Sequence, residues 1–118
     1  DEFVIIKNEE SISLVRLSVG DLGFNDLTTQ DEIYAKAVSL GLALCPPEVG
    51  PHLRLLYNDQ PFGPMLLIGM KPMSILGGDY PRIFSLRHYY GGLSLDTCDI
   101  PSDMRWGPEN RFVFSLGK

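Results

Sequence analysis

Hydrophobic and polar residues alternate over residues 11–19, SISLVRLSV, so that successive side chains fall on opposite faces. This period of two is typical of a β-strand. The apolar run FVII at residues 3–6 predicts a short strand that pairs with the first one. The chain is therefore expected to begin with two paired strands.

A helix is predicted over residues 29–40. Its start is marked by a capping box, TQDE at residues 29–32, in which the threonine hydroxyl and the glutamate carboxylate satisfy amides of the first turn. Apolar residues then recur at the helical spacing i, i+4 and i+7, at Ile33, Ala37 and Leu40. Gly41 supplies the left-handed position that commonly follows a helix.

After this helix, Pro46 and Pro47 prevent the helix from continuing. Residues 47–50, PEVG, are predicted to form one turn, and an antiparallel meander is expected to follow. The expected strands are residues 52–57, 65–71, 82–88, 93–96 and 111–116. Residues 65–71 are nearly all apolar, which predicts a central strand covered on both faces. Turns are expected at 58–61, 77–79 and 91–92, and residues 97–110 are expected to form a polar loop.

These elements predict a single α+β domain over residues 1–118. Short connections between consecutive strands favour antiparallel pairing. We expect one N-terminal helix packed on a mainly antiparallel, curled β-sheet of about five to seven strands. The alternative is a small barrel-like sheet that curls around the helix.

The charge is unevenly spread along the chain. The net charge is −5, and residues 1–32 hold eight acidic but only two basic side chains. Nucleic-acid binding is not expected, because it relies on clustered Lys and Arg. A membrane-spanning helix needs about 20 apolar residues, which no segment offers. No signal peptide is apparent, although the start at Asp1 leaves a trimmed or cleaved chain open. Cys45 and Cys98 are expected to be reduced, which favours a cytoplasmic location.

No catalytic, metal-binding or cofactor motif stands out in the sequence. The two histidines, His52 and His88, and the two cysteines lack metal-ligand spacing, so neither a metal nor a cofactor is predicted. Cys45 follows a helix C-terminus, where the helix dipole disfavours a thiolate. It is therefore interpreted as a buried structural cysteine rather than a nucleophile, and no catalytic residue is assigned.

The segment around Pro46, Pro47 and Pro51 holds the densest group of side chains that could take part in binding or catalysis. The candidate binding residues are Glu48, His52, Arg54, Tyr57 and Trp106. His52 and Arg54 would share one face of a strand at 52–57, with Arg82 or His88 added from neighbouring strands. The alternative is a Glu48–Arg54 salt bridge that stabilises the turn. Trp106, the single tryptophan, is either an interface anchor or a cap on the open end of the core.

Residues 44–57, LCPPEVGPHLRLLY, carry the specific part of a resemblance that extends over residues 17–116. The chain resembles a small bacterial family of uncharacterised proteins with the motif LCPPEVGPxLRLxY. Shorter matching segments are LGF at 22–24, MKP at 70–72, IFSL at 83–86 and RFVF at 111–114. The resemblance implies a bacterial cytoplasmic origin and transfers no activity or catalytic residue.

The function expected from the sequence is non-catalytic protein binding, with self-association as a homodimer through an exposed strand edge or the aromatic loops. One alternative is a small hydrolase-like enzyme that uses Glu48, His52 and Arg54. Another is a small-ligand domain with a pocket between the helix and the sheet.

Overall fold

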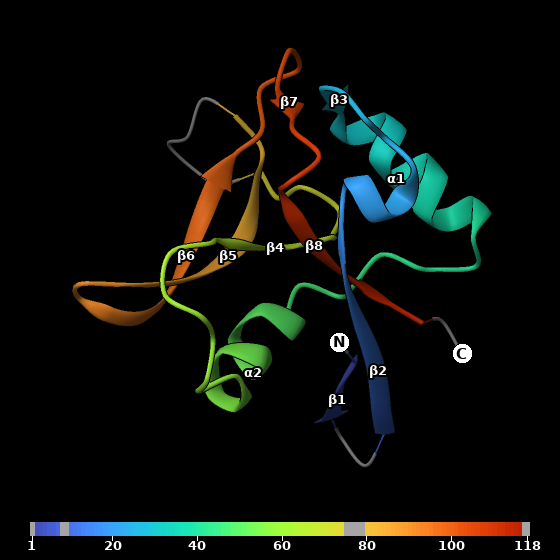
Figure 1. Ribbon diagram of the computed structural model, residues 1–118. Coiled ribbons are helices and arrows are strands. Elements are labelled where there is room, and N and C mark those ends of the chain that lie inside the picture. The colour runs from blue at the N-terminus through green and yellow to red at the C-terminus, as the bar shows by residue number, and fades with distance from the viewer. Residues whose placement is uncertain (1, 8–9, 75–79, 117–118) are drawn as a thin grey trace.

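The last strand in the sequence order, β8 (Arg111–Ser115), lies in the middle of the main sheet (Figure 1). The computed structural model describes residues 2–7, 10–74 and 80–116. Its main sheet has six strands in the order β1-β2-β8-β4-β5-β6. The bounds are β1 Glu2–Lys7, β2 Glu10–Ser18, β4 Leu66–Ile68, β5 Arg82–Tyr89, β6 Gly92–Asp99 and β8 Arg111–Ser115. A second, two-stranded sheet pairs β3 (Thr28–Thr29) with β7 (Arg105–Trp106).

The sheet is mainly antiparallel, as predicted, but it is mixed. β8 pairs antiparallel with β2 and parallel with β4. The expected antiparallel meander is therefore wrong at this point, because β8 inserts between two earlier strands. All three central residues of β8, Phe112, Val113 and Phe114, are fully buried, so this strand must be covered on both faces.

One face of β8 is covered by helix α1 (Gln30–Ser39). The ring of Tyr34 from this helix meets Phe112 and Phe114 edge-on, with ring centroids 6.3 and 5.9 Å apart. Ile33 and Ala37 from the same helix are also fully buried. The apolar stripe predicted for residues 29–40 therefore packs into the core at Ile33 and Ala37, whereas its third member, Leu40, is 56% exposed at the end of the helix.

The other face of the sheet is covered by a second helix, α2 (Val49–Leu56). Val113 of β8 pairs with Arg16 of β2, and directly paired residues lie on the same face. Nη1 of Arg16 donates to the hydroxyl of Tyr57, which caps α2, over a distance of 2.6 Å. Side chains alternate along β8, so Phe112 and Phe114 point to one face and Val113 to the other. Since α1 contacts the two phenylalanines and α2 lies on the side of Val113 and Arg16, the two helices lie on opposite faces of the sheet.

Helix α1 begins and ends as its local sequence predicts. The capping box is complete: the amide of Glu32 donates to Thr29 Oγ1, and the amide of Thr29 donates to Glu32 Oε1. At the other end Gly41 adopts φ of 91°, in the left-handed region. Its amide donates to Val38 O, and the amide of Leu42 donates to Ala37 O. This is the Schellman arrangement.

The strand predicted at residues 52–57 is wrong, because these residues belong to α2. A strand would place Leu53, Leu55 and Tyr57 on one face, but Leu55 is 77% exposed whereas the other two are buried. The buried side chains are those of Val49, Leu53 and Tyr57, a spacing of four that fits one face of a helix, and Gly50 next to Val49 is buried as well. The turn predicted at 47–50 runs into this helix.

Most other predicted strands are confirmed. β1 and β2 pair, β5 and β6 form the hairpin, and β4 lies within residues 65–71 with both faces buried. The loop predicted at 97–110 is partly wrong, because β6 extends to Asp99 and β7 forms at Arg105–Trp106. The turn predicted at 77–79 lies outside the described residues.

Gly69 provides a test of how tightly the sheet packs beside β8. A Cβ at this position would lie 2.5 Å from Phe114 Cε1 and 2.8 Å from Val113 O. Because the backbone oxygen cannot move freely, we expect Gly69→Ala to lower the free energy of unfolding by about 1–3 kcal/mol in urea denaturation. In Gly91→Ala the new Cβ meets nothing within 4 Å, so that matched variant should stay within about 0.5 kcal/mol of the parent. Equal stability of the two variants would contradict this packing.

Candidate functional site

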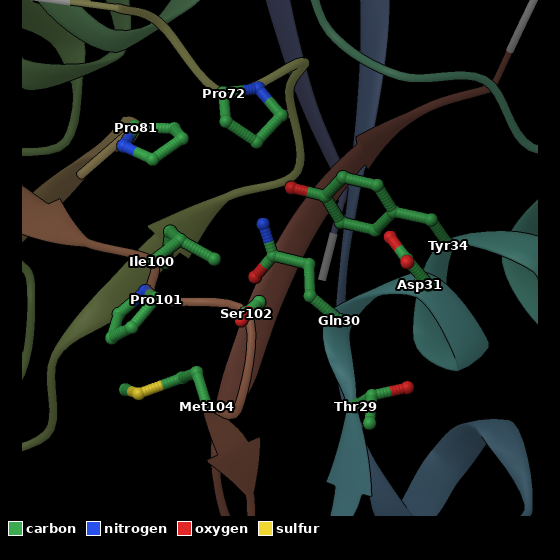
Figure 2. Close-up of a pocket in the computed structure, with 10 residues that line it drawn as sticks. All are labelled: Thr29, Gln30, Asp31, Tyr34, Pro72, Pro81, Ile100, Pro101, Ser102 and Met104. Atoms are coloured by element: carbon green, nitrogen blue, oxygen red, sulfur yellow. The ribbon is translucent and has the colours of Figure 1, made fainter.

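A cavity of about 300 Å³ opens between the start of α1 and the loop that joins β6 to β7 (Figure 2). The pairing of β3 with β7 holds these segments together, because Thr28 pairs with Trp106 and Thr29 with Arg105. This volume corresponds to about ten water molecules at roughly 30 Å³ each. The cavity is therefore large enough for a small organic ligand.

The side chain of Gln30 lies in the middle of the residues that line this cavity (Figure 2). It is 6% exposed, and its Oε1 accepts a hydrogen bond of 3.0 Å from the indole Nε1 of Trp106. An indole N–H can only donate, so the amide orientation is determined: the oxygen faces Trp106 and the Nε2 group faces the cavity. Nε2 is buried and has no hydrogen-bond partner in the described structure. A buried amide donor of this kind lacks an acceptor that a ligand can supply.

Three prolines, Pro72, Pro81 and Pro101, form much of the apolar wall. Backbone hydrogen bonds connect the segments that carry them. Pro72 and Pro81 are brought alongside by the bridge between Met73 and Arg82, whose amides and carbonyls bond at 2.7 and 2.8 Å. The carbonyl of Pro81 accepts from the amide of Ile100 at 2.8 Å. Backbone hydrogen bonds therefore tie the described parts of this wall to one another and to the end of β6.

The wall opposite the prolines is formed by Tyr34 of α1. Its hydroxyl donates to Met70 O at 2.8 Å and accepts from the Met70 amide at 3.1 Å. Burial raises the pKa of Tyr34 above its usual value, although the hydrogen bond to Met70 acts in the opposite direction. The phenol is therefore neutral near pH 7, and its ring presents an apolar surface to the cavity.

Asp31 is the one acidic or basic side chain among the residues that line the cavity in the described part of the chain. Thr29, Ser102 and Gln30 supply neutral polar groups, and the rest of the lining is apolar or aromatic. Such a lining can bind a largely apolar ligand. Gln30 can orient the ligand by a hydrogen bond at the buried end, and the exposed Asp31 can accept a hydrogen bond from a donor group of the ligand.

The predicted binding residues on α2 do not form the surface that the sequence indicated. His52 and Arg54 lie in a helix, where residues two apart are rotated by about 200° and point in different directions. Their predicted placement on one face of a strand is therefore wrong. Glu48 precedes the same helix as its N-cap residue. Binding by these side chains stays a prediction.

Arg54 joins the end of α2 to the β5–β6 hairpin. Its Nη1 donates to Gln60 Oε1 at 2.8 Å, Ser94 O at 3.1 Å and Arg87 O at 3.2 Å, and its Nη2 donates to Tyr57 O at 2.6 Å. Burial lowers the pKa of Arg54, and the nearby Tyr57 acts in the opposite direction. These oxygens are all neutral, so the guanidinium connects backbone segments through hydrogen bonds.

The other residues proposed for this surface also have structural partners. His88 Nδ1 lies 2.7 Å from Gln60 O, and Arg82 Nε lies 2.7 Å from the carboxylate of Asp99. Trp106 is 4% exposed, with its ring edge-on to Phe112 at 5.6 Å, and its strand β7 lies at the opposite end of the molecule from α2 (Figure 1). This placement matches the alternative in which Trp106 caps the end of the core.

Both cysteines are free in this structure. Cys45 is buried, its Sγ donates to Val113 O at 3.5 Å, and burial raises its pKa to about 12. Such a thiol is unreactive near neutral pH. Among the described residues, no three His, Cys, Asp or Glu side chains form a group that could hold a metal ion.

Sequence reasoning missed Gln30, which it treated only as a residue within the capping box. The partner of Gln30, Trp106, is 76 positions away, so no local pattern links the two. The prolines of the cavity wall were visible as turn residues, but nothing in their spacing indicated that they meet.

Comparisons with protein-family models, with curated proteins and with solved structures found no match for this chain. The resemblance to a bacterial family through residues 44–57 therefore stays a prediction. Within the described residues, no helix has the length and apolar character needed to cross a membrane.

Arg54 should contribute to stability through its contacts with backbone oxygens. We expect Arg54→Ala to lower the free energy of unfolding by about 2–3 kcal/mol, because three part-buried carbonyls lose their donor. Chemical denaturation measures this change. His52→Ala, on the same helix but outside this network, should cost less than about 1 kcal/mol. A stable Arg54→Ala variant would show that these hydrogen bonds contribute little.

The capping box beside the cavity should make stability depend on acid pH. Hydrogen bonds from the Thr29 amide and from the Thr28 and Thr29 hydroxyls hold the pKa of Glu32 below its usual value. The folded state therefore takes up this proton less readily than the unfolded state. The contribution is complete above the ordinary glutamate pKa of about 4.3 and is lost as the pH falls through the lowered value. In thermal unfolding across this range, Glu32→Gln should lose less stability than the parent, and an equal loss would contradict the prediction.

Proposed function

We propose that this domain binds a small organic ligand in the cavity beside Gln30. The observation that carries the proposal is the buried Nε2 group of Gln30, which faces the cavity without a partner. A ligand oxygen that accepts from this group would satisfy a donor that otherwise costs about 1–3 kcal/mol. The ligand is therefore expected to present a carbonyl-type oxygen at its buried end.

The walls of the cavity support a pre-formed binding site. Its backbone anchors, from Met70, Met73 and Pro81, lie in or beside the main sheet. Trp106 holds the Gln30 amide in one orientation, so little conformational freedom is lost when a ligand binds. This supports the small-ligand alternative over the enzyme alternative, since Arg54 already uses its Nη groups in hydrogen bonds within the fold.

Protein binding is the second candidate function, and a separate surface favours it. Phe62 is 53% exposed and Tyr90 98% exposed, and their rings lie 5.3 Å apart. Phe62 also meets the ring of His88 edge-on at 5.5 Å. Aromatic side chains of this kind are enriched at protein interfaces. They lie at the turn end of the β5–β6 hairpin, which would place a partner or a second copy there.

The ligand proposal is testable with isocaproamide, a short branched amide that carries a carbonyl oxygen and an apolar body. Its eight non-hydrogen atoms at about 0.5 kcal/mol each give an expected Kd of about 1 mM. In ¹H–¹⁵N NMR spectra, the side-chain amide signals of Gln30 and the single indole signal of Trp106 should shift and saturate during a titration.

Gln30→Glu is the decisive variant, because it keeps an oxygen for Trp106 but replaces the Nε2 donor with a second oxygen. At neutral pH it should weaken isocaproamide binding at least tenfold, the equivalent of about 1.4 kcal/mol. Val38→Ala, on the exposed side of α1, should bind as the parent does. Circular dichroism confirms that each variant is folded. Unchanged binding by Gln30→Glu, or no saturable shift in the parent, would overturn the proposal.

A further inference from the structure

The geometry points to a ligand class for this cavity: a small aminoacyl compound, with an ammonium group next to a carbonyl and a short apolar side chain. This inference rests on the proposed function and extends it. Gln30 supplies the donor for the carbonyl, and Asp31 supplies the negative charge for the ammonium group. Both side chains come from the first turn of α1 and line the same cavity, Gln30 at its buried end and the exposed Asp31 nearer solvent (Figure 2). One ligand in this cavity can therefore contact both.

The charge of the lining favours a cation over an anion. Asp31 is its one acidic or basic residue in the described structure, and no Lys, Arg or His lies among the lining residues. A carboxylate in the cavity would face like charge and have no cationic partner. An ammonium group beside Asp31 gains a charge-assisted hydrogen bond, which is stronger than a neutral one.

The positive end of α1 does not reverse this preference. The helix dipole favours negative charge at the first turn. That charge is already present in Asp31 and Glu32, and the Glu32 carboxylate accepts from both Thr28 and Thr29. The helix start is therefore complemented by the protein's own carboxylates before any ligand arrives.

The volume of the cavity and its apolar wall determine the expected size and side chain of the ligand. Ile100, Pro101 and Met104 line the cavity on the side of the β6–β7 loop. Figure 2 shows these side chains across the cavity from Asp31 and Tyr34. A branched aliphatic side chain can pack there while the carbonyl reaches Gln30. A volume of about 300 Å³ suits a single aminoacyl unit of about ten non-hydrogen atoms.

Three probes with one carbon skeleton separate these features: isocaproamide is neutral, leucinamide adds an ammonium group, and isocaproate replaces the amide with a carboxylate. The titrations are run at about pH 6, below the usual α-amino pKa, with Gln30 and Trp106 signals as the readout. We expect leucinamide to bind about two- to fivefold more tightly than isocaproamide, as for a partly exposed ion pair. Isocaproate should bind more weakly than both.

Asp31→Asn tests which side chain provides this preference, and Asp103→Asn is the matched control. Both remove one exposed carboxylate near the same loop, but Asp103 does not line the cavity. Asp31→Asn should make leucinamide and isocaproamide bind equally, whereas Asp103→Asn should keep their ratio. The ratio is measured within each variant, so a change in stability cancels.

Each outcome separates the two proposals. If isocaproamide binds through Gln30 but leucinamide binds no more tightly, the aminoacyl inference is overturned and the proposed function stands. The same holds if Asp31→Asn leaves the ratio unchanged, or if isocaproate binds best. If no probe shifts the Gln30 signals, the proposed function fails and the inference fails with it.

Discussion

The burial of β8 on both faces is the constraint on which the rest of the structure depends. Phe112, Val113 and Phe114 have no exposed surface, and each large apolar side chain is worth about 1.5–3 kcal/mol when buried. A strand of this kind can be covered only if elements pack on both sides of the sheet. Helix α1 covers one face and α2 the other, so the position of β8 explains why the described chain places an α-helix on each side of the sheet.

The cavity is a consequence of how the core closes at its end beside α1. Trp106 packs edge-on against Phe112 and must find an acceptor for its buried indole N–H. Gln30 provides that acceptor, and the same hydrogen bond directs the amide donor toward the cavity. One side chain therefore contributes both to the closure of the core and to the chemistry that a ligand would meet. This coupling keeps the donor rigid, which favours selective binding over adaptable contact.

Polar residues at the opposite end of the sheet serve a different purpose. Arg54, Gln60 and His88 connect α2 and the following loop to the end of β5, where β4 no longer provides a pairing partner. Their side chains form hydrogen bonds with backbone carbonyl groups that would otherwise lack a partner. The sequence predicted that Arg54 and His88 contribute to a binding surface. In the structure, their side chains form hydrogen bonds that join neighbouring elements.

The sequence by itself determined the features that depend on neighbours a few residues apart. The capping box of α1, the left-handed Gly41, the β5–β6 hairpin and the apolar strand β4 all follow from such local hydrogen bonds and periodicity. It misjudged α2, because Leu53, Leu55 and Tyr57 fit a strand as well as Val49, Leu53 and Tyr57 fit a helix, and only burial separates the two. The tertiary structure alone decided the place of β8 and the meeting of Gln30 with Trp106. Both join distant segments, and such pairings are selected by burial of the whole core, which no local pattern records.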